Sequence, residues 1–176
     1  MIVETGHFAL ILALALALIQ SSVPIVGAAR GERRLMAVAG PAALAEMVAI
    51  LLSFLALTWA HVVSDFSVLN VVENSHSLKP MIYKVSGVWG NHEGSMLLWV
   101  LILGLCGGAV ALFGRNLPAS LKANVLGVQG LISTAFLAFI LLTSNPFMRL
   151  AKPPLEGNDL NPVLQDVGLA IHPPLL

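Results

Sequence analysis

The sequence predicts an all-α integral membrane fold of about four transmembrane helices, with two outward-facing loops and a short interfacial helix. Hydrophobic residues make up 57% of the 176 residues, and only nine basic and nine acidic residues interrupt them. Few soluble domains of this size carry so much apolar sequence, and four stretches reach the roughly 20 apolar residues that cross a bilayer. Residues 1–176 are therefore expected to form a transmembrane helical bundle.

The first predicted span covers about residues 8–28. The residues before it include Glu4 and His7 but no Lys or Arg, and the apolar run is longer than the core of a cleaved signal peptide. This stretch is therefore expected to be a retained helix whose N-terminus lies outside the cytoplasm. Pro24, near the inner end, is expected to kink it.

The second predicted span, about residues 38–60, contains the only acid inside a predicted helix. A charge at the bilayer centre costs roughly 2.5–3.5 kcal/mol, so such a residue suggests a function. Glu46 lies about two turns from the inner end, however, where water or Arg34 could reach it. A proton pathway and a simple solvated carboxylate both remain open.

The third and fourth predicted spans cover about residues 96–113 and 125–143. The third contains Gly104 and Gly108, four positions apart, which is a pattern that lets two helices approach closely. The sequence therefore predicts a helix contact along this face.

Basic residues predict the orientation of the chain. The two short connections carry five of the nine cations, and such loops stay in the cytoplasm. These five are Arg30, Arg33, Arg34, Arg115 and Lys122. The longer loops, about residues 61–95 and 144–176, then face outward, and all five histidines fall on that side: His7, His61, His76, His92 and His172.

Several kinds of chemistry are disfavoured. Zero net charge and the lack of a basic stripe argue against nucleic-acid binding. Cys106 is the only cysteine, so an intrachain disulfide or a Cys-x-x-Cys redox motif is impossible within this sequence. His92-Glu93 does not complete a zinc motif, because Met96 stands where the second histidine would be needed.

The second outer loop ends in a polar, proline-containing tract. Asn161 and Pro162 are typical of a helix start and Gly168 of a stop, which predicts a short surface helix over 161–167. Pro173 holds His172 in an extended conformation just before a further helix start. The imidazole could ligate a haem iron, cap a helix or remain solvated. Because the sequence stops shortly after this predicted helix start, we expect a fragment or one piece of a split protein.

Many polar motifs, in order and at matching spacing, resemble the CcmF (CycK) family, the large membrane component of bacterial cytochrome c maturation. They are Asp65-Phe-Ser-Val68, Asn74-Ser75, Tyr83-Lys84, Trp89-Gly90, His92-Glu-Gly-Ser95, Leu97-Leu-Trp99, Asn145-Pro-Phe147, Glu156-Gly-Asn-Asp-Leu-Asn-Pro162, Leu164-Gln-Asp166 and His172-Pro-Pro-Leu-Leu176. The resemblance covers essentially the whole chain, from Gly6 onward.

The resemblance implies that residues 1–176 are the N-terminal transmembrane part of a larger helical bundle. It implies part of a haem lyase that receives haem and attaches it to apocytochrome c. It would make His172 an axial ligand of the haem iron. The glycines around Trp89, at positions 87, 90 and 94, separately predict a packing and ligand-facing platform on which Trp89 is a candidate haem contact. The resemblance also implies the bacterial inner membrane with functional loops in the periplasm. Implied partners are the haem chaperone, other maturation components, apocytochrome c and the remainder of the polypeptide.

The sequence departs from the family pattern at His76 and at Lys79-Pro80. The family's Trp-rich motif and its further haem-ligating histidines do not occur here, so activity of this part alone is not expected. A transporter or proton-translocating subunit, suggested by Glu46, is the main alternative function. A purely structural scaffold subunit is the third.

Overall fold

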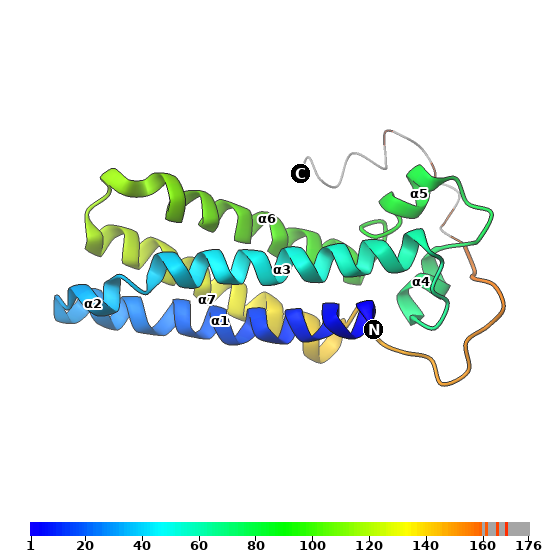
Figure 1. Ribbon diagram of the computed structural model, residues 1–176, viewed down its shortest axis with the longest axis horizontal. Helices are drawn as coiled ribbons and strands as arrows, with labels where there is room; N and C mark the ends of the chain where they lie inside the picture. The colour runs from blue at the N-terminus through cyan, green and yellow to red at the C-terminus, as the bar shows by residue number, and fades with distance from the viewer. Residues whose placement is uncertain (160, 162–164, 166–167, 169–176) are drawn as a thin grey trace.

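The computed structural model describes residues 1–159, 161, 165 and 168, and its main feature is a bundle of four long helices (Figure 1). These helices are α1 (Ile2–Arg30), α3 (Ala39–Val62), α6 (His92–Phe113) and α7 (Ala119–Thr143). Shorter elements connect them: α2 (Arg33–Met36), α4 (Leu69–Asn74), α5 (Met81–Ser86) and the 3-10 turn η1 (Gly114–Asn116).

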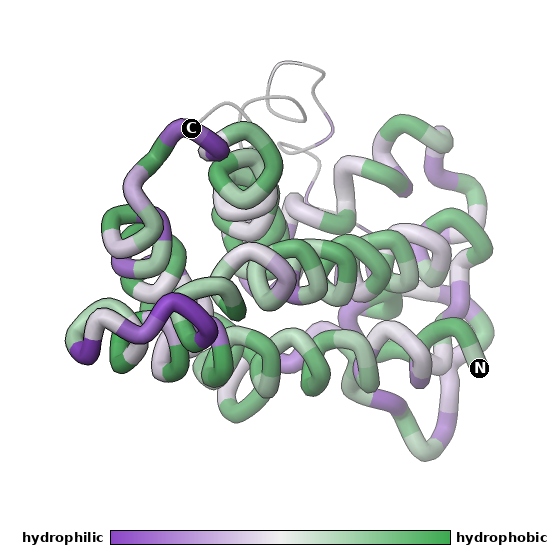
Figure 2. Tube along the Cα trace, turned by 60° about the vertical axis from the view of Figure 1, so that its left-hand side comes forward, coloured by the Kyte–Doolittle hydropathy of each residue, from purple (hydrophilic) through white to green (hydrophobic). Residues whose placement is uncertain are grey.

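All four long helices are long and apolar enough to cross a membrane, and no strand occurs among the described residues. The predicted all-α membrane fold with four spans is therefore confirmed. Figure 2 shows hydrophobic residues along the four helices and hydrophilic residues gathered in the connections.

The helix ends differ from the predicted ends because polar first turns lie outside the apolar windows. Helix α1 begins at Ile2 rather than near residue 8, and α7 begins at Ala119 rather than near residue 125. Helix α6 begins at His92 rather than at residue 96 because Asn91 caps it. The chain continues helically through Pro24 to the end of α1.

Small residues set the spacing of neighbouring helices. Helix α6 packs on α3 with Gly104 and Gly108 against Met47, as the glycine spacing predicts. A β-carbon on Gly108 would stand 2.3 Å from the Met47 sulfur, so no larger residue fits without movement. On α7, Gly130 lies close to the backbone of α1, where its β-carbon would be 2.9 Å from the Ser21 nitrogen. Helices α1 and α6 therefore lie on opposite sides of the pair formed by α3 and α7.

The bundle interior contains polar side chains. Gln20 is completely buried and donates from Nε2 to the Leu126 carbonyl oxygen at 2.9 Å. Glu46 is 1% exposed, and no ion pair joins it to Arg34 among the described residues, so the expected access to water or Arg34 is wrong. Seven buried side-chain atoms find no hydrogen-bond partner in the part of the chain that is described, and five of them belong to the long helices: Gln20 Oε1, Glu46 Oε1, Ser53 Oγ, His61 Nε2 and Ser133 Oγ.

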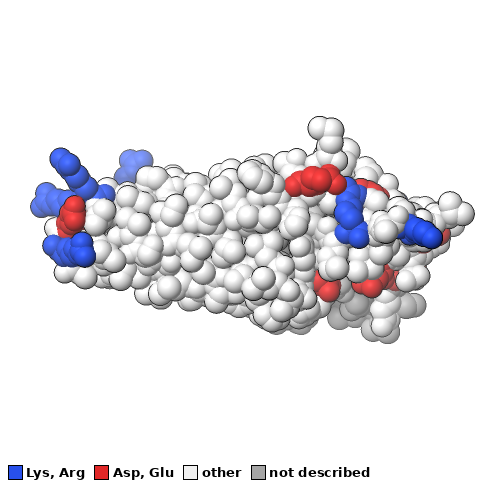
Figure 3. All heavy atoms as spheres, turned by 90° about the horizontal axis from the view of Figure 1, so that it is seen from below, with Lys and Arg blue, Asp and Glu red and all other residues white. Residues whose placement is uncertain are grey.

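Charged residues gather at the two ends of the bundle, and the face seen in Figure 3 carries no charged side chain along the length between them. One end, here called the basic end, carries the five cations of the short connections. The opposite end, here called the loop platform, is built from α4, α5, the 87–91 turn, the start of α6 and residues 144–159. The N-terminus also lies at the loop platform (Figure 1).

Candidate functional site

A hydrogen-bonded turn between α5 and α6 forms the centre of the loop platform. The Asn91 Oδ1 atom accepts from the Gly94 backbone N–H at 2.8 Å, which caps α6. The same oxygen accepts from Asn70 Nδ2 of α4 at 2.9 Å, while Asn91 Nδ2 donates to the Gly87 carbonyl at 2.8 Å. One side chain therefore joins α4, the end of α5 and the start of α6.

This turn holds Trp89 against the bundle. The indole ring stacks on Phe54 of α3, with ring centroids 6.4 Å apart and planes 14° from parallel. Ser95 Oγ donates to the Trp89 carbonyl oxygen at 2.6 Å, which fixes the backbone as well. The side chain is half-buried, so part of the indole lies on the core and part at the platform surface.

Residues 156–159, here called the docked strip, close the C-terminal end of α4. The Asn158 N–H donates to the Val72 carbonyl at 2.7 Å, and the Asp159 N–H donates to the Ser75 carbonyl at 3.2 Å. Helix ends leave such carbonyls without partners, and the strip supplies them. A β-carbon on Gly157 would lie 2.1 Å from the Ser75 oxygen, so only glycine fits this approach.

Hydrogen bonds hold one end of the docked strip and an ion pair holds the other. Glu156 accepts from the Ser77 N–H at 2.9 Å and from Ser77 Oγ at 2.5 Å, and these bonds keep the pKa of its carboxyl below its ordinary value. Lys79 donates to the Asn74 carbonyl and to Asp159 Oδ1, both at 2.8 Å. Burial lowers the pKa of the Lys79 ammonium, and the Asp159 carboxylate opposes that shift. Lys79 is therefore a structural cation here.

A second tie joins the N-terminus to the segment after α7. Arg149 pairs with Glu4, and its Nη1 lies 3.3 Å from Asp65 Oδ2. Nearby, the His7 Nε2 atom lies 3.1 Å from Asn145 Nδ2, and the imidazole stacks on Phe147 at 6.1 Å. These contacts give His7 a role in holding the loops.

The other described histidines are dispersed. His61 is fully buried in α3 with Nδ1 3.2 Å from the Leu57 carbonyl oxygen. His76 Nδ1 accepts from the Leu78 N–H at 3.2 Å. His92 begins α6, is exposed, and meets the edge of Phe139 at 6.4 Å. Within the described residues, no three His, Cys, Asp or Glu side chains gather as a metal site.

Two predicted features fall outside the described residues. His172 is one of them, and the predicted surface helix over 161–167 is the other, apart from Asn161 and Gln165. His172 follows Asp159, the last residue of the docked strip, by thirteen positions in the sequence.

Sequence reasoning missed Asn70, Asn91, Arg149 and Glu156 as organising residues. An asparagine directly before an apolar helical run signals an N-cap, so Asn91 could have been found. Arg149 gives no local signal, because its partner Glu4 lies at the other end of the chain.

Comparisons with known proteins agree with this architecture. A family model described as "Cytochrome C assembly protein" matches residues 89–176. The chain is 65% identical over its whole length to "Cytochrome c-type biogenesis protein CycK" of Bradyrhizobium diazoefficiens, and 57% identical to "Cytochrome c-type biogenesis protein CcmF" of Pseudomonas aeruginosa. It covers 27% of each of these relatives.

A solved structure named "Cytochrome c Heme Lyase CcmF" has a similar fold, with a TM-score of 0.84 and 26% identity. The match covers 98% of this chain and 27% of that one. The chain thus spans about a quarter of the length of the relatives that it matches.

Proposed function

The chain belongs to the cytochrome c assembly protein family, and from this premise we propose that it forms the N-terminal part of a haem lyase of cytochrome c-type biogenesis. Such a protein receives haem and attaches it to apocytochrome c. The observation that carries the proposal is 65% identity to a cytochrome c-type biogenesis protein along all 176 residues. The remaining three quarters of such a protein would supply the rest of the site.

The proposed location is the bacterial inner membrane, with the loop platform in the periplasm. The five cations at the basic end support this orientation, because short loops rich in Arg and Lys stay in the cytoplasm. The platform would then meet the haem chaperone, other maturation components and apocytochrome c. The remainder of the polypeptide would pack beside the four helices.

Haem is the proposed substrate of the platform, and two observations support a fit. Trp89 offers an indole held flat against Phe54, which suits a planar, apolar macrocycle. His61 is completely buried in α3, so a macrocycle cannot reach its ring in this packing. His172, carried by the segment that follows the docked strip, is the proposed axial ligand of the haem iron.

Ligation requires the neutral form of the imidazole. Protons therefore compete with iron for His172 as the pH falls through the ordinary histidine pKa of roughly 6.5. Lys79, Glu156 and the glycine at position 157 anchor the docked strip, which precedes His172 in the sequence. When bound, haem supplies the group that is transferred to the apocytochrome cysteines.

The test uses the full-length polypeptide with His172→Gly and His172→Ala. Both variants should abolish holocytochrome c formation and deplete the haem that copurifies with the protein. Added imidazole should partly restore both readouts in His172→Gly, since it can enter the vacated ligand space. His92→Ala is the matched control, because His92 is exposed at the same platform and should leave both readouts near wild type. Wild-type haem content in His172→Ala would disprove the ligand assignment.

Trp89→Ala should weaken haem retention or assembly of the maturation complex in the same background. Trp89→Phe should keep most of both, because it preserves an aromatic ring against Phe54. Unchanged haem content and assembly in Trp89→Ala would count against the platform contact.

A transporter or proton-translocating subunit is the second candidate, favoured by one observation. Glu46 is buried in the bundle with its Oε1 atom unpartnered, and intramembrane acids often serve ion pathways. Proton flux in proteoliposomes that is lost in Glu46→Gln, with haem content unaffected by His172→Ala, would favour this function over the first.

A further inference from the structure

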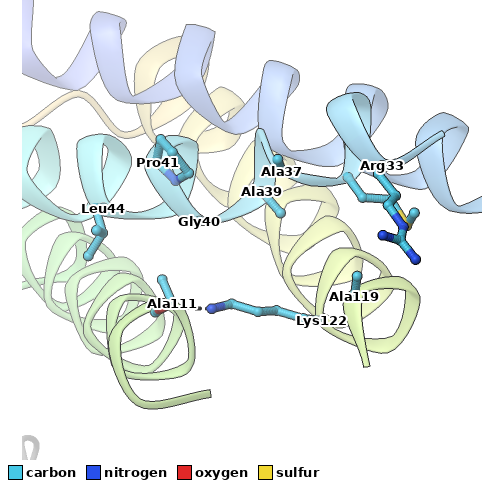
Figure 4. A pocket seen from close by; sticks show the side chains of 10 residues that line it. Arg33, Ala37, Ala39, Gly40, Pro41, Leu44, Ala111, Ala119 and Lys122 are labelled. Atoms are coloured by element: carbon cyan, nitrogen blue, oxygen red, sulfur yellow. Dashed lines mark hydrogen bonds between the residues drawn. The ribbon is translucent and has the colours of Figure 1, made fainter. Parts of the chain in front are cut away.

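At the basic end, a pocket of about 360 Å³ opens between the start of α3, the end of α6 and the start of α7. Figure 4 shows two cationic side chains at this pocket, Arg33 from α2 and Lys122 from α7. We propose that it binds an anionic phospholipid, with these two cations attracting the headgroup phosphate and an acyl chain along the apolar wall. Nothing in the proposed haem chemistry requires or supplies this site.

The cations have capacity left for an anion. Lys122 Nζ donates to the Ala111 carbonyl oxygen at 2.7 Å, near the end of α6. An ammonium carries three donors, so two remain for a phosphate. Arg33 is exposed and forms no ion pair among the described residues. Its guanidinium can therefore bind a phosphate by donating two parallel hydrogen bonds.

The charge around the pocket selects an anion. Five cations lie at this end of the bundle, and Glu32 is the one acid near them in the described chain. Basic residues next to a membrane span attract anionic lipid headgroups. The pocket lies at the ends of helices that are long and apolar enough to cross a membrane, so lipid headgroups are expected beside it.

The rest of the lining is apolar, which favours a lipid over a soluble phosphate compound. The apolar residues are Met36, Ala37, Ala39, Gly40, Pro41, Leu44, Ala111 and Ala119. One turn deeper along α3, Val48 is 47% exposed and continues the same face as Leu44. A headgroup at the cations would therefore direct its acyl chain along α3, into the bilayer.

Gly40 provides a way to fill the pocket without disturbing its charge. A β-carbon added there meets no atom within 4 Å, so the space beside α3 is open. Gly40→Leu should project into this space and compete with the acyl chain. Gly40 is therefore a steric probe that is independent of the two cations.

The experiment measures phosphatidylglycerol bound to the full-length protein in detergent, by native mass spectrometry, against phosphatidylcholine with identical acyl chains. Wild type should retain phosphatidylglycerol preferentially. The double variant Arg33→Gln/Lys122→Gln should weaken that retention about tenfold or more, and Gly40→Leu should weaken retention of the same lipid. Arg34→Gln is the matched control, since Arg34 lies on the same short helix but does not line the pocket.

Equal retention in the double variant and wild type would overturn the proposal, as would an equal loss in Arg34→Gln, which indicates general charge attraction. Displacement of the lipid by millimolar inorganic phosphate would show a phosphate site instead of a lipid site. Thermal unfolding of each variant accompanies the lipid measurement. A loss of lipid retention at an unchanged unfolding midpoint supports direct binding. If the Lys122 substitution loosens α6, Gly40→Leu decides the question, because it must lose lipid retention while its unfolding midpoint stays the same.

Discussion

The carbonyl oxygen of Val88 lies 1.5 Å from the point where a β-carbon on Gly94 would stand. No rotation of a side chain can relieve this approach, because the obstructing atom belongs to the backbone. Gly94 is in the first turn of α6, so the glycine allows the 87–91 turn to fold directly onto the helix start. The position of Trp89 depends on that contact.

Gly94→Ala should therefore destabilise the protein by about 3 kcal/mol, because the turn must move away from α6. Chemical unfolding of the purified protein in detergent measures the change. Gly40→Ala is the control, as its added methyl group meets open space. Equal stabilities for the two variants would mean that the turn adapts at little cost.

Asn91 provides a graded test of the same turn. Asn91→Ala should lower stability by about 2 kcal/mol, since it removes the helix cap and the bonds to Asn70 and Gly87. Asn91→Asp should lose less, because its carboxylate still accepts from the Gly94 N–H. If Asn91→Ala and Asn91→Asp lower the stability equally, the cap bond from the Gly94 N–H contributes little. The bonds donated by the Asn91 amide nitrogen then account for the loss.

Acid should release the docked strip. The folded-state pKa of Glu156 is lowered, so its stabilising contribution is present above the ordinary carboxyl pKa and is lost as the pH falls through the lowered value. Amide exchange at Asn158 and Asp159, corrected for the intrinsic effect of pH, should speed up as the pH is taken below about 4. Glu156→Gln should exchange faster at neutral pH and lose this acid dependence. Amide exchange rates at Asn158 and Asp159 that change neither with pH nor with the Glu156→Gln substitution would contradict the role of Glu156.

The orientation of the four spans can be measured by reporter fusions. A reporter active only outside the cytoplasm should work after Asn70 or Asp159, in the loop platform, because the platform is predicted to face the periplasm. It should fail after Gly31 or Asn116, at the basic end. The opposite pattern would reverse the topology.

Hydropathy was sufficient to predict the four spans, because a bilayer demands long apolar helices whatever their neighbours. It misplaced their ends, since Glu4 and His7 are polar yet helical and find partners in Arg149 and Asn145. The glycine spacing at Gly104 also predicted a real helix contact.

Most of the loop platform could not be predicted from the sequence alone. Helices α4 and α5 have six residues each, too short to be stable in isolation, so tertiary contacts decide whether they form. The docked strip pairs residues that are more than eighty positions apart, as between Val72 and Asn158. No local pattern encodes such a pairing, whereas the N-cap at Asn91 is local and was readable.

That long-range pairing sets an order of events during synthesis. The carbonyl groups at the end of α4 leave the ribosome 86 residues before the strip that binds them. At about 5–20 residues per second, this is a wait of roughly 4–17 seconds, during which two further spans must be made. The segment between α3 and α6 therefore spends that interval unfinished and open to chaperones and proteases, and α4 is completed only after the fourth span has emerged.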